Sequence, residues 1–310
     1  MELRLLASFV AVAEELHFGR AAARLHLAQP SLSQQIQRLE RSVGVQLVER
    51  SSRQVNLTPA GEVLRDLARS ILTQTEEARS TVREVALGRA GTLQIGYNFA
   101  SGQRILPAAL VRMNTILPNV TVNLIEQRTG PQLAALSAGA LDIGLVYGRP
   151  AATEFHSQPL LQVPLVAVVG RGHSWARRAR TSFSELAGQS CILFERQQCP
   201  AMYDAIHHAA ERSGIKLNVE HHLDDPNATA IMVSVKPMVG FASSVRAGAA
   251  PTAGYNQTVT VALHDPVPTV ELCIVWRADD TRPIVRSFLG CIESARSSES
   301  VTKLQSLLAQ

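Results

Sequence analysis

Residues 18–53 carry two short helical patterns joined by a tight turn, and this arrangement limits what the N-terminal part of the chain can fold into. Apolar residues recur at helical spacing over residues 18–25 and again over residues 32–43. Pro30 lies between the two patterns, and proline suits the first position of a helix because its missing N–H would be unpaired there. The second helix is therefore predicted to begin at Pro30. A helix, a short turn and a second helix form the unit that places its second helix in a DNA major groove.

The polar face of the second predicted helix carries hydrogen-bonding side chains. At about 100° per residue, Gln34, Gln37, Arg38 and Arg41 point away from the apolar stripe. Further polar residues gather at the start of the helix, where free N–H groups favour a phosphate. Side chains of these types read base edges and hold phosphates. The candidate DNA contacts of this helix are Gln29, Pro30, Ser31, Ser33, Gln34, Gln37 and Arg38.

An ordinary pair of surface helices would also have a polar face. The local net charge distinguishes such a pair from a DNA-binding one. Residues 18–57 contain six arginines against two glutamates, a net charge of +4. The whole chain also has a formal net charge of +4. The positive excess is therefore local, as a phosphate-binding surface requires.

The segments on either side complete a small domain. Apolar residues at helical spacing over residues 5–16 predict an opening helix that packs against the other two. Two β-prone runs within residues 46–57 surround a polar turn and predict a β-hairpin, the wing of a winged helix. Arg50 and Arg53 are expected to lie on the DNA backbone or in the minor groove. The alternative is that both are ordinary surface arginines.

A long helix is predicted to follow the wing. The pair Thr58–Pro59 is a helix start, because a hydroxyl caps the first turn and proline suits its first position. The next breaker is Gly88, which gives about 30 residues or ~45 Å. Leu64, Leu67 and Ile71 fit the apolar positions of a coiled-coil seam. Such a thin stripe cannot bury itself, so we expect dimerisation through these three residues.

From residue 92 onwards the pattern alternates between strands and helices, and the cycle occurs twice. Alternation of this kind predicts parallel sheets covered by helices. We predict two similar Rossmann-like α/β subdomains joined by two crossing strands, at residues 160–169 and 258–272. Proteins with two such lobes bind a small ligand in the cleft between them. The predicted division is a winged helix-turn-helix domain at 1–58, a linker helix at 59–88, an effector-binding domain at 89–296 (subdomain I at 92–163 and 265–296, subdomain II at 164–264) and a polar tail at 297–310.

Loops at the C-terminal ends of the predicted strands are the candidate ligand site, because ligands of open parallel sheets gather there, near helix N-termini. Thr129 and Arg149 are the sharpest candidates, since a hydroxyl, a helix N-terminus and a guanidinium can together hold a carboxylate. The alternative for Arg149 is a salt bridge at the surface or between the lobes. The candidate effector contacts are Ala100, Ser101, Gly102, Gln103, Thr129 and Arg149 in the first lobe, and Pro200 and Met202 as an apolar wall from the second.

Metal and enzyme chemistry find no support in the sequence. The pairs His207–His208 and His221–His222 are adjacent residues, which point in different directions and cannot chelate one metal ion together. No nucleophile elbow, Walker loop or GxGxxG motif occurs. We therefore expect no enzyme activity, no metal and no cofactor other than a small-molecule effector.

The cysteines and the hydropathy bear on where the protein functions. The four cysteines are scattered without a CxxC pair, so we expect reduced structural cysteines. A redox switch between Cys191 and Cys199 is the alternative. The sequence contains no run of 18 or more apolar residues, so no membrane-spanning helix is expected. Residues 1–18 contain acids and lack the basic start and cleavage site of a signal peptide, so a cytoplasmic location is expected.

The N-terminal stretch resembles the DNA-binding domain of LysR-type transcriptional regulators, and a looser resemblance continues to about Arg296. It implies a periplasmic-binding-protein-like fold for the second region, paired linker helices, and a tetramer built as a dimer of dimers. The implied partners are double-stranded operator DNA, RNA polymerase and a small acidic metabolite. The matching residues are Phe9, Ala13, Phe18, Ala21, Ala22, Leu25, Gln29, Pro30, Ser31, Ser33, Ile36, Leu39, Glu40, Gly44, Leu47, Arg50, Leu57, Thr58 and Gly61.

Within that family the chain is most similar to the branch that senses muconate- and benzoate-like acids. That branch carries a serine in the first loop, a threonine in the second and an arginine in the third. Thr129 matches the threonine and Arg149 matches the arginine in type, whereas Ala100 stands at the serine position with Ser101 one step on. The small-residue turn usual before the strand at Val239 is replaced by residues 236–238, Lys-Pro-Met.

Two classes of protein fit these patterns. The first is a ligand-responsive, DNA-binding transcriptional regulator, either activator or repressor. The second is a solute-binding or transferase-like α/β protein with an accessory helical module. The basic helix-turn-helix and the linker helix at 59–88 favour the first class.

Overall fold

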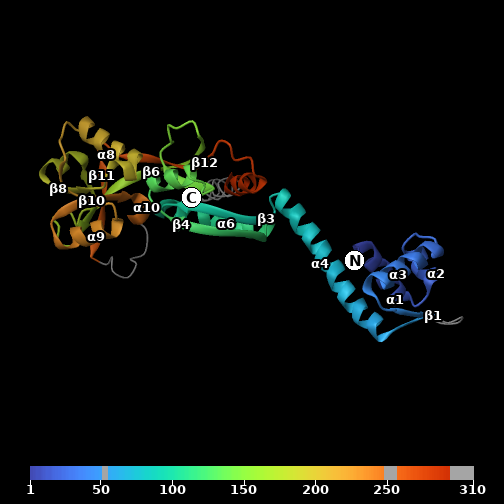
Figure 1. Ribbon diagram of the computed structural model, residues 1–310. Coiled ribbons are helices and arrows are strands. Elements are labelled where there is room, and N and C mark those ends of the chain that lie inside the picture. The colour runs from blue at the N-terminus through green and yellow to red at the C-terminus, as the bar shows by residue number, and fades with distance from the viewer. Residues whose placement is uncertain (51–54, 248–256, 294–310) are drawn as a thin grey trace, which may run out of the picture. The chain divides into compact units, whose positions relative to one another are not determined.

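The computed structural model describes residues 1–50, 55–247 and 257–293 of the chain. It contains two compact units, Met1–Glu84 and Val85–Gln310 (Figure 1). None of the described helices combines the length and the apolar character needed to cross a membrane.

Three short helices and a hairpin build the first unit around one apolar core. Leu32, Ile36 and Leu39 are fully buried there, as their spacing predicts. Leu16 and Val43, expected at the ends of two apolar stripes, are instead 46% and 40% exposed, because each lies where its helix ends. The elements are α1 (Leu3–Glu15), α2 (Phe18–Arg24), α3 (Gln29–Val43), β1 (Val48–Arg50) and β2 (Val55–Leu57), followed by α4 (Pro59–Ala86).

The predicted helix boundaries and the hairpin are confirmed to within a residue or two. Helix α3 begins at Gln29, one residue before Pro30, and ends at Val43; it is capped by Gly44, whose φ of +82° suits glycine. Strands β1 and β2 pair antiparallel, as expected for the wing. Thr58 caps α4, because its Oγ1 accepts a hydrogen bond of 3.0 Å from the Gly61 N–H.

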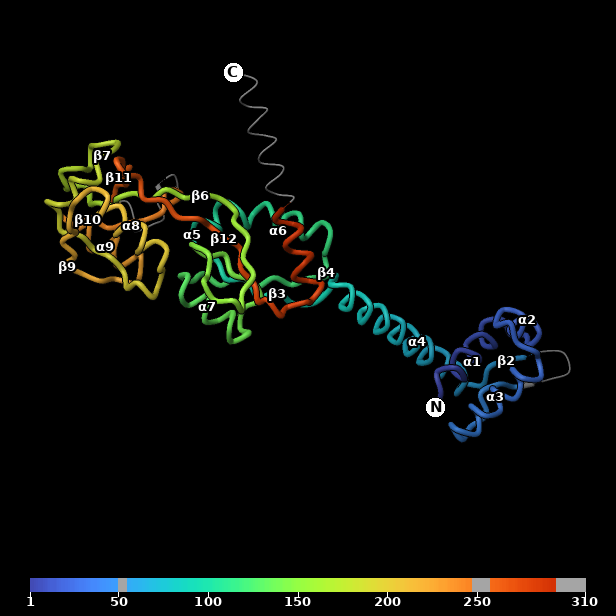
Figure 2. Tube along the Cα trace, turned by 90° about the horizontal axis from the view of Figure 1, so that it is seen from above, coloured from blue at the N-terminus to red at the C-terminus, as the bar shows by residue number. Residues whose placement is uncertain are grey.

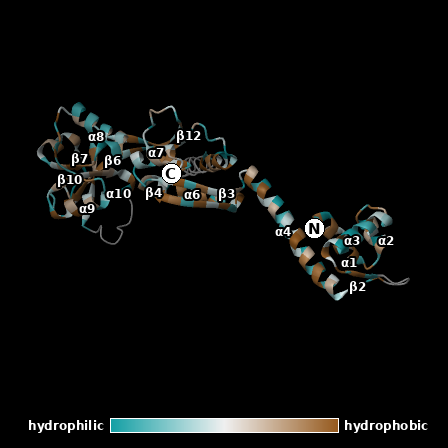
Figure 3. Ribbon diagram, viewed as in Figure 1, coloured by the Kyte–Doolittle hydropathy of each residue, from teal (hydrophilic) through white to brown (hydrophobic). Residues whose placement is uncertain are grey.

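Part of the apolar stripe of α4 packs against the core of the first unit. Gly61 and Ala68 are buried, and Leu64 and Ile71 pack against the core of the first unit. Leu67 is 56% exposed. Figure 3 shows the apolar residues of α4 in brown. Leu64 and Ile71, expected in a seam between chains, are therefore already covered in part by their own domain, and only Leu67 is left largely open. Their role in dimerisation stays a prediction.

The second unit has two α/β lobes. Lobe I contains β3 (Ala90–Tyr97), α5 (Phe99–Arg104), α6 (Leu106–Ile116), β4 (Asn119–Glu126), α7 (Thr129–Ser137), β5 (Ile143–Tyr147), β12 (Thr269–Arg277) and a helix at residues 283–293. Lobe II contains β7 (Arg180–Ser182), η1 (Phe183–Gly188), β8 (Ser190–Leu193), η2 (Arg196–Gln198), α8 (Pro200–Arg212), β9 (Asn218–His222), α9 (Pro226–Val235), β10 (Met238–Ser243), α10 (Ser244–Ala247) and β11 (Thr258–His264).

One strand, β6 (Phe155–Gly170), belongs to both lobes (Figure 2). It pairs with β12 over residues 155–164 and with β10 and β11 over residues 165–170. The predicted crossing strand at 160–169 is thus part of a longer strand. The second predicted crossing, at 258–272, is divided between β11 and β12.

The sheet is mixed, which corrects the expectation of parallel sheets. Its strand order is β4-β3-β5-β12-β6-β10-β8-β9; β11 also pairs with β6, and β7 pairs with β11. Strands β4, β3 and β5 are parallel in lobe I, as are β10, β8 and β9 in lobe II. The crossing strands β12 and β6 run antiparallel to these neighbours. They enter each sheet from the other lobe rather than through a helical crossover, so the alternation of elements could not show their direction.

Helices begin within the segments that were expected to be ligand-site loops. Residues 99–104, expected in a loop, form α5, while α7 begins at Thr129 and α8 at Pro200. A capping box explains α5: the Asn98 Oδ1 accepts from the Ser101 N–H at 3.0 Å, and the Ser101 Oγ accepts from the Asn98 N–H at 3.1 Å. The Asn-x-x-Ser spacing was the sequence signal for this start.

Candidate DNA-binding and effector sites

The polar face of α3 is open, as the helical spacing predicts. Gln34, Gln37 and Arg38 are exposed, as are Gln29 and Pro30 at the start of the helix. Ser31 and Ser33 are half-buried beside them. The Arg38 guanidinium lies 3.5 Å from the Glu2 carboxylate, an exposed contact that costs little to exchange for a phosphate. These positions leave α3 able to enter a groove with its polar face first.

A buried polar pair fixes α3 to α1, and sequence reasoning missed it. The Ser8 hydroxyl donates to the Gln35 Oε1 at 2.5 Å, and both residues are buried. A buried hydrogen bond of this kind sets the register of one helix against another, because leaving either group unpaired costs free energy. In the sequence Gln35 is surrounded by other polar residues. Its position one helical turn before Leu39 was the only indication that it faces the core.

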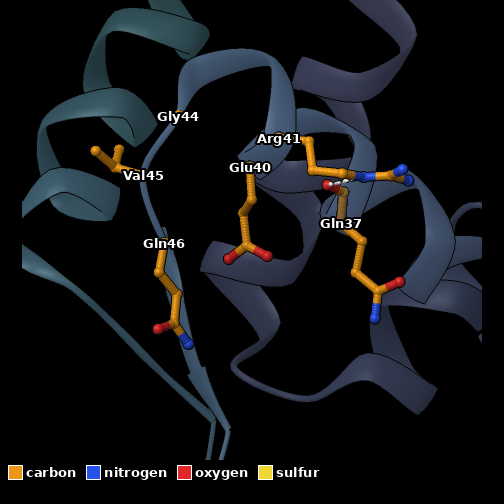
Figure 4. A pocket seen from close by; sticks show the side chains of 6 residues that line it. All are labelled: Gln37, Glu40, Arg41, Gly44, Val45 and Gln46. Atoms are coloured by element: carbon orange, nitrogen blue, oxygen red, sulfur yellow. Dashed lines mark hydrogen bonds between the residues drawn. The ribbon is translucent and has the colours of Figure 1, made fainter.

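Glu40 connects α3 to the base of the wing (Figure 4). Its Oε1 accepts hydrogen bonds from the backbone N–H groups of Leu47 and Val48, at 2.9 and 3.1 Å. Figure 4 shows the carboxylate pointing from α3 towards the segment that carries Gln46 and leads into β1. A charged acceptor shared by two N–H groups is a strong link, so Glu40 positions the wing relative to the helix. Glu40 matches the family pattern in the sequence, but the sequence did not indicate this function.

The wing arginines are only partly described. Arg50 ends β1, but its side chain lies outside the described part of the structure, as does the whole of Arg53. Their contacts with DNA stay predictions.

In the second unit, Thr129 lies at the boundary between the lobes. It is buried, and its Oγ1 accepts from the Tyr147 N–H at 3.1 Å. The same hydroxyl lies 3.5 Å from the Cys199 Sγ of lobe II. The next residue, Gly130, is so close to lobe II that an added Cβ would lie 2.0 Å from the Gln197 carbonyl oxygen. The predicted threonine is therefore placed where the two lobes meet.

Most of the other predicted contacts are near this boundary, with different exposures. Ala100 and Ser101 are buried in α5, whereas Gly102 is half-buried and Gln103 is exposed. From lobe II, Pro200 begins α8 and Met202 is buried in its first turn.

Tyr147 also lies at the lobe boundary, where its hydroxyl is hydrogen-bonded to Ser243 of lobe II. Burial raises the pKa of Tyr147 to about 12, so its side chain remains a neutral hydroxyl at physiological pH.

Arg149 is at the surface. Its Nε lies 2.7 Å from a Glu271 carboxylate oxygen, and its side chain is 59% exposed. This hydrogen bond lowers the pKa of Glu271 and keeps the pair ionised. The salt bridge that the sequence left open as the alternative is thus formed, and the structure does not bring the Arg149 guanidinium to Thr129. The effector contact of Arg149 stays a prediction.

A different arginine, Arg128, occupies the lobe boundary, and sequence reasoning overlooked it. Burial lowers the pKa of Arg128, and its Nε is buried without a hydrogen-bond partner among the described residues. Its Cζ lies 4.6 Å from the centre of the Phe194 ring in lobe II. Arg128 also precedes the first residue of α7, where a cation is unfavourable against the helix dipole. In the sequence, the position of an arginine directly before a helix was the one indication that Arg128 has a role other than stabilising that helix.

All four cysteines are free and buried, as expected from their spacing. Burial raises the pKa of Cys199, and it raises the pKa of Cys191 to about 12. Both thiols are therefore protonated at neutral pH and are poor nucleophiles.

Known proteins match both units. Residues 3–62 match the family described as bacterial regulatory helix-turn-helix protein, lysR family, and residues 86–296 match the LysR substrate binding domain. The chain belongs to the LysR family of transcriptional regulators.

Individual relatives agree along nearly the whole length. The HTH-type transcriptional regulator AlsR of Bacillus subtilis (strain 168) is 30% identical over 290 residues, which is 93% of this chain and 94% of AlsR. The DNA-binding transcriptional dual regulator OxyR of Escherichia coli (strain K12) is 34% identical over 199 residues, 64% of this chain and 65% of OxyR. The crystal structure of CbnR, a LysR family transcriptional regulator, aligns with a TM-score of 0.78 and 27% identity over 94% of this chain and 100% of CbnR. Full-length CbnR in complex with its target DNA aligns with a TM-score of 0.79 and 26% identity, over 96% of this chain and 100% of that one.

This LysR-type protein is a ligand-responsive transcriptional regulator with a DNA-binding helix-turn-helix and an effector-binding domain. The relatives just named are themselves regulators, rather than solute-binding or transferase-like proteins. They are too varied to single out the muconate and benzoate branch.

We expect Gln34→Ala and Arg38→Ala to reduce the preference for the operator over random DNA, by about 1–3 kcal/mol for each base-specific hydrogen-bonding side chain that is removed. Both side chains are exposed, so neither change opens a cavity. Competition gel-shift assays measure the effect, with Gln74→Ala on the exposed side of α4 as the control. Unchanged discrimination between operator and random DNA would remove these residues from base recognition.

We expect Glu40→Ala to weaken binding to every DNA sequence and to flatten the salt dependence, because a displaced wing binds fewer phosphates and each phosphate accounts for about 0.9 in the salt slope. Glu40→Gln keeps an acceptor oxygen and should retain most of the affinity. Glu49→Ala is the matched control, because it removes an equal charge from an exposed position on the hairpin. Equal behaviour of Glu40→Ala and Glu49→Ala would show that only charge matters.

Proposed function

We propose that this regulator responds to a small metabolite bearing a carboxylate, bound where the two lobes meet beside Arg128 and Thr129. The observation that carries the proposal is the buried Nε of Arg128, which has no acceptor among the described residues. Leaving such a donor unpaired costs about 1–3 kcal/mol or more for a charged group, which a bound carboxylate would recover.

The surroundings of Arg128 support a ligand of modest size. Thr129 supplies a hydroxyl and the start of α7 supplies N–H groups, while Met202 and Phe194 supply apolar surface from lobe II. A ligand that touches both lobes can favour one arrangement of the lobes over another, as a ligand-driven switch requires. The muconate- and benzoate-like acids indicated by the sequence resemblance are the first compounds to test.

Thermal unfolding of the full chain with benzoate, cis,cis-muconate, adipate and succinate tests this proposal. A ligand at 100 times its Kd stabilises the folded state by about 2.7 kcal/mol, so a binding acid raises the melting temperature. We expect Arg128→Met to abolish the shift and Arg149→Met to leave it unchanged, because Arg149 is already paired with Glu271. The reverse result would restore Arg149 as the effector contact. No shift with any acid would refute a carboxylate effector.

The regulator is also proposed to self-associate, as a dimer through α4 and as a dimer of dimers. Exposed apolar side chains on α4 support this: Val63, Leu67 and Val82 are 62%, 56% and 69% exposed. Apolar groups in such numbers on one helix are better covered than left in water. Action in the cytoplasm and contact with RNA polymerase belong to the same proposal, because both follow from binding a promoter.

We expect Leu67→Asp to lower the oligomeric state and the operator affinity together, because it would bury a charge between chains. Thr73→Asp, at an exposed polar position of the same helix, is the control. Sedimentation velocity and gel-shift assays on the same samples measure both effects. A monomeric parent protein at micromolar concentration would contradict this role for α4.

A further inference from the structure

Two arginine–phenylalanine contacts cross the lobe boundary in opposite directions. Arg128 of lobe I lies over the Phe194 ring of lobe II, with its Cζ 4.6 Å from the ring centre. Arg246, in α10 of lobe II, lies over the Phe99 ring of lobe I, with its Cζ 4.2 Å from the ring centre. Phe99 is the first residue of α5, beside the buried Ala100 and Ser101. Each lobe therefore presents one guanidinium to the other.

Neither guanidinium has a carboxylate partner within salt-bridge distance in the described ranges, 1–50, 55–247 and 257–293. Asp224 and Asp225 act on Arg128 only from longer range, and each carboxylate already accepts a backbone N–H, that of Glu195 at 2.9 Å and that of Asn227 at 2.8 Å. Residues 248–256, which follow Arg246 closely, contain no aspartate or glutamate. The two positive charges are therefore left without a neutralising acid from the nearby sequence.

The two charges also act on each other. Burial is the main reason that the pKa of Arg128 is lowered, and Arg246 contributes to the lowering in the same direction. Arg246 likewise favours the ionised form of the Tyr147 hydroxyl, at the same boundary. The arginines from the two lobes thus share one region, where they repel each other in the absence of an anion.

The ring contacts leave the guanidiniums able to bind anions. A cation over a ring uses the face of the guanidinium, whereas its five N–H donors point outwards in the plane of the group. Those donors match the geometry of a carboxylate or a phosphate. Each phenylalanine therefore orients an arginine of the opposite lobe and leaves its donors available.

We propose that the effector is a dianion, with one anionic group bound by Arg128 and the other by Arg246. This inference rests on the proposed effector site and adds the number of charges that the site accepts. Because the arginines belong to different lobes, one dianion neutralises both charges, removes their repulsion and connects the lobes. A monoanion can satisfy only one of them, so it has little differential affinity for the connected arrangement.

Calorimetric titration of the full chain with matched acids tests the inference. The probes are succinate, glutarate and adipate, each compared with its own monomethyl ester, which keeps the chain length and removes one charge. We expect at least one diacid to bind ten times or more tightly than its ester. Arg246→Met should bring that ratio close to one, and Arg246→Lys should keep a preference for the diacid. Arg112→Met, which removes a charge from an exposed position on α6, should change nothing.

The outcomes separate this inference from the proposal beneath it. If an ester binds as tightly as its diacid and Arg128→Met abolishes both, the carboxylate site stands and the dianion is refuted. If Arg246→Met lowers only the melting temperature of the free protein and the diacid preference persists, the Arg246–Phe99 contact merely holds the lobes together. If neither diacids nor esters bind to the parent protein, both ideas are refuted.

Discussion

The hydrogen-bonding of one strand, β6, determines how the effector-binding domain is built. Its first part pairs with β12 in lobe I, and its last part pairs with β10 and β11 in lobe II. The change of partner falls between Pro164 and Leu165. The strand continues from one sheet into the other without a break, so its backbone hydrogen bonds to β12, β10 and β11 join the two lobes. The loops at the inner ends of both lobes are therefore brought to one boundary, where Thr129 meets Cys199.

Polar groups are concentrated at that boundary, in a part of the domain that is otherwise well packed. Thr129 and Ser101 are buried and hydrogen-bonded within the chain, so they help to hold the framework as well as offering polar atoms. Arg128 differs, because its Nε is buried and unpaired in the described structure. Buried polar groups without partners are rare in folded proteins, since each one costs free energy. In a family of ligand-responsive regulators, such a group is best explained by a ligand that completes it.

In the DNA-binding domain, too, a few polar groups hold the functional elements in position. Its recognition helix is fixed from one side by the Ser8–Gln35 hydrogen bond and tied to the wing by Glu40. Neither group has to touch DNA to affect recognition, because both set where the contacting side chains stand. The exposed residues of α3 can then differ without loss of the fold, because none of them fills the core.

The sequence by itself determined the elements whose signal is local. The stripe of Leu32, Ile36 and Leu39, the cap at Thr58 and the strand–helix alternation after residue 92 each predicted what the structure contains, because periodicity and capping act over a few residues. Only the tertiary structure decided the direction of the crossing strands and which arginine faces the lobe boundary. Arg149 and Arg128 both follow strands of lobe I and look alike in the sequence. Glu271, more than a hundred residues away in the chain, pairs with Arg149, whereas Arg128 lies over the Phe194 ring of lobe II. Such a choice depends on partners brought together by folding, so no local pattern contains it.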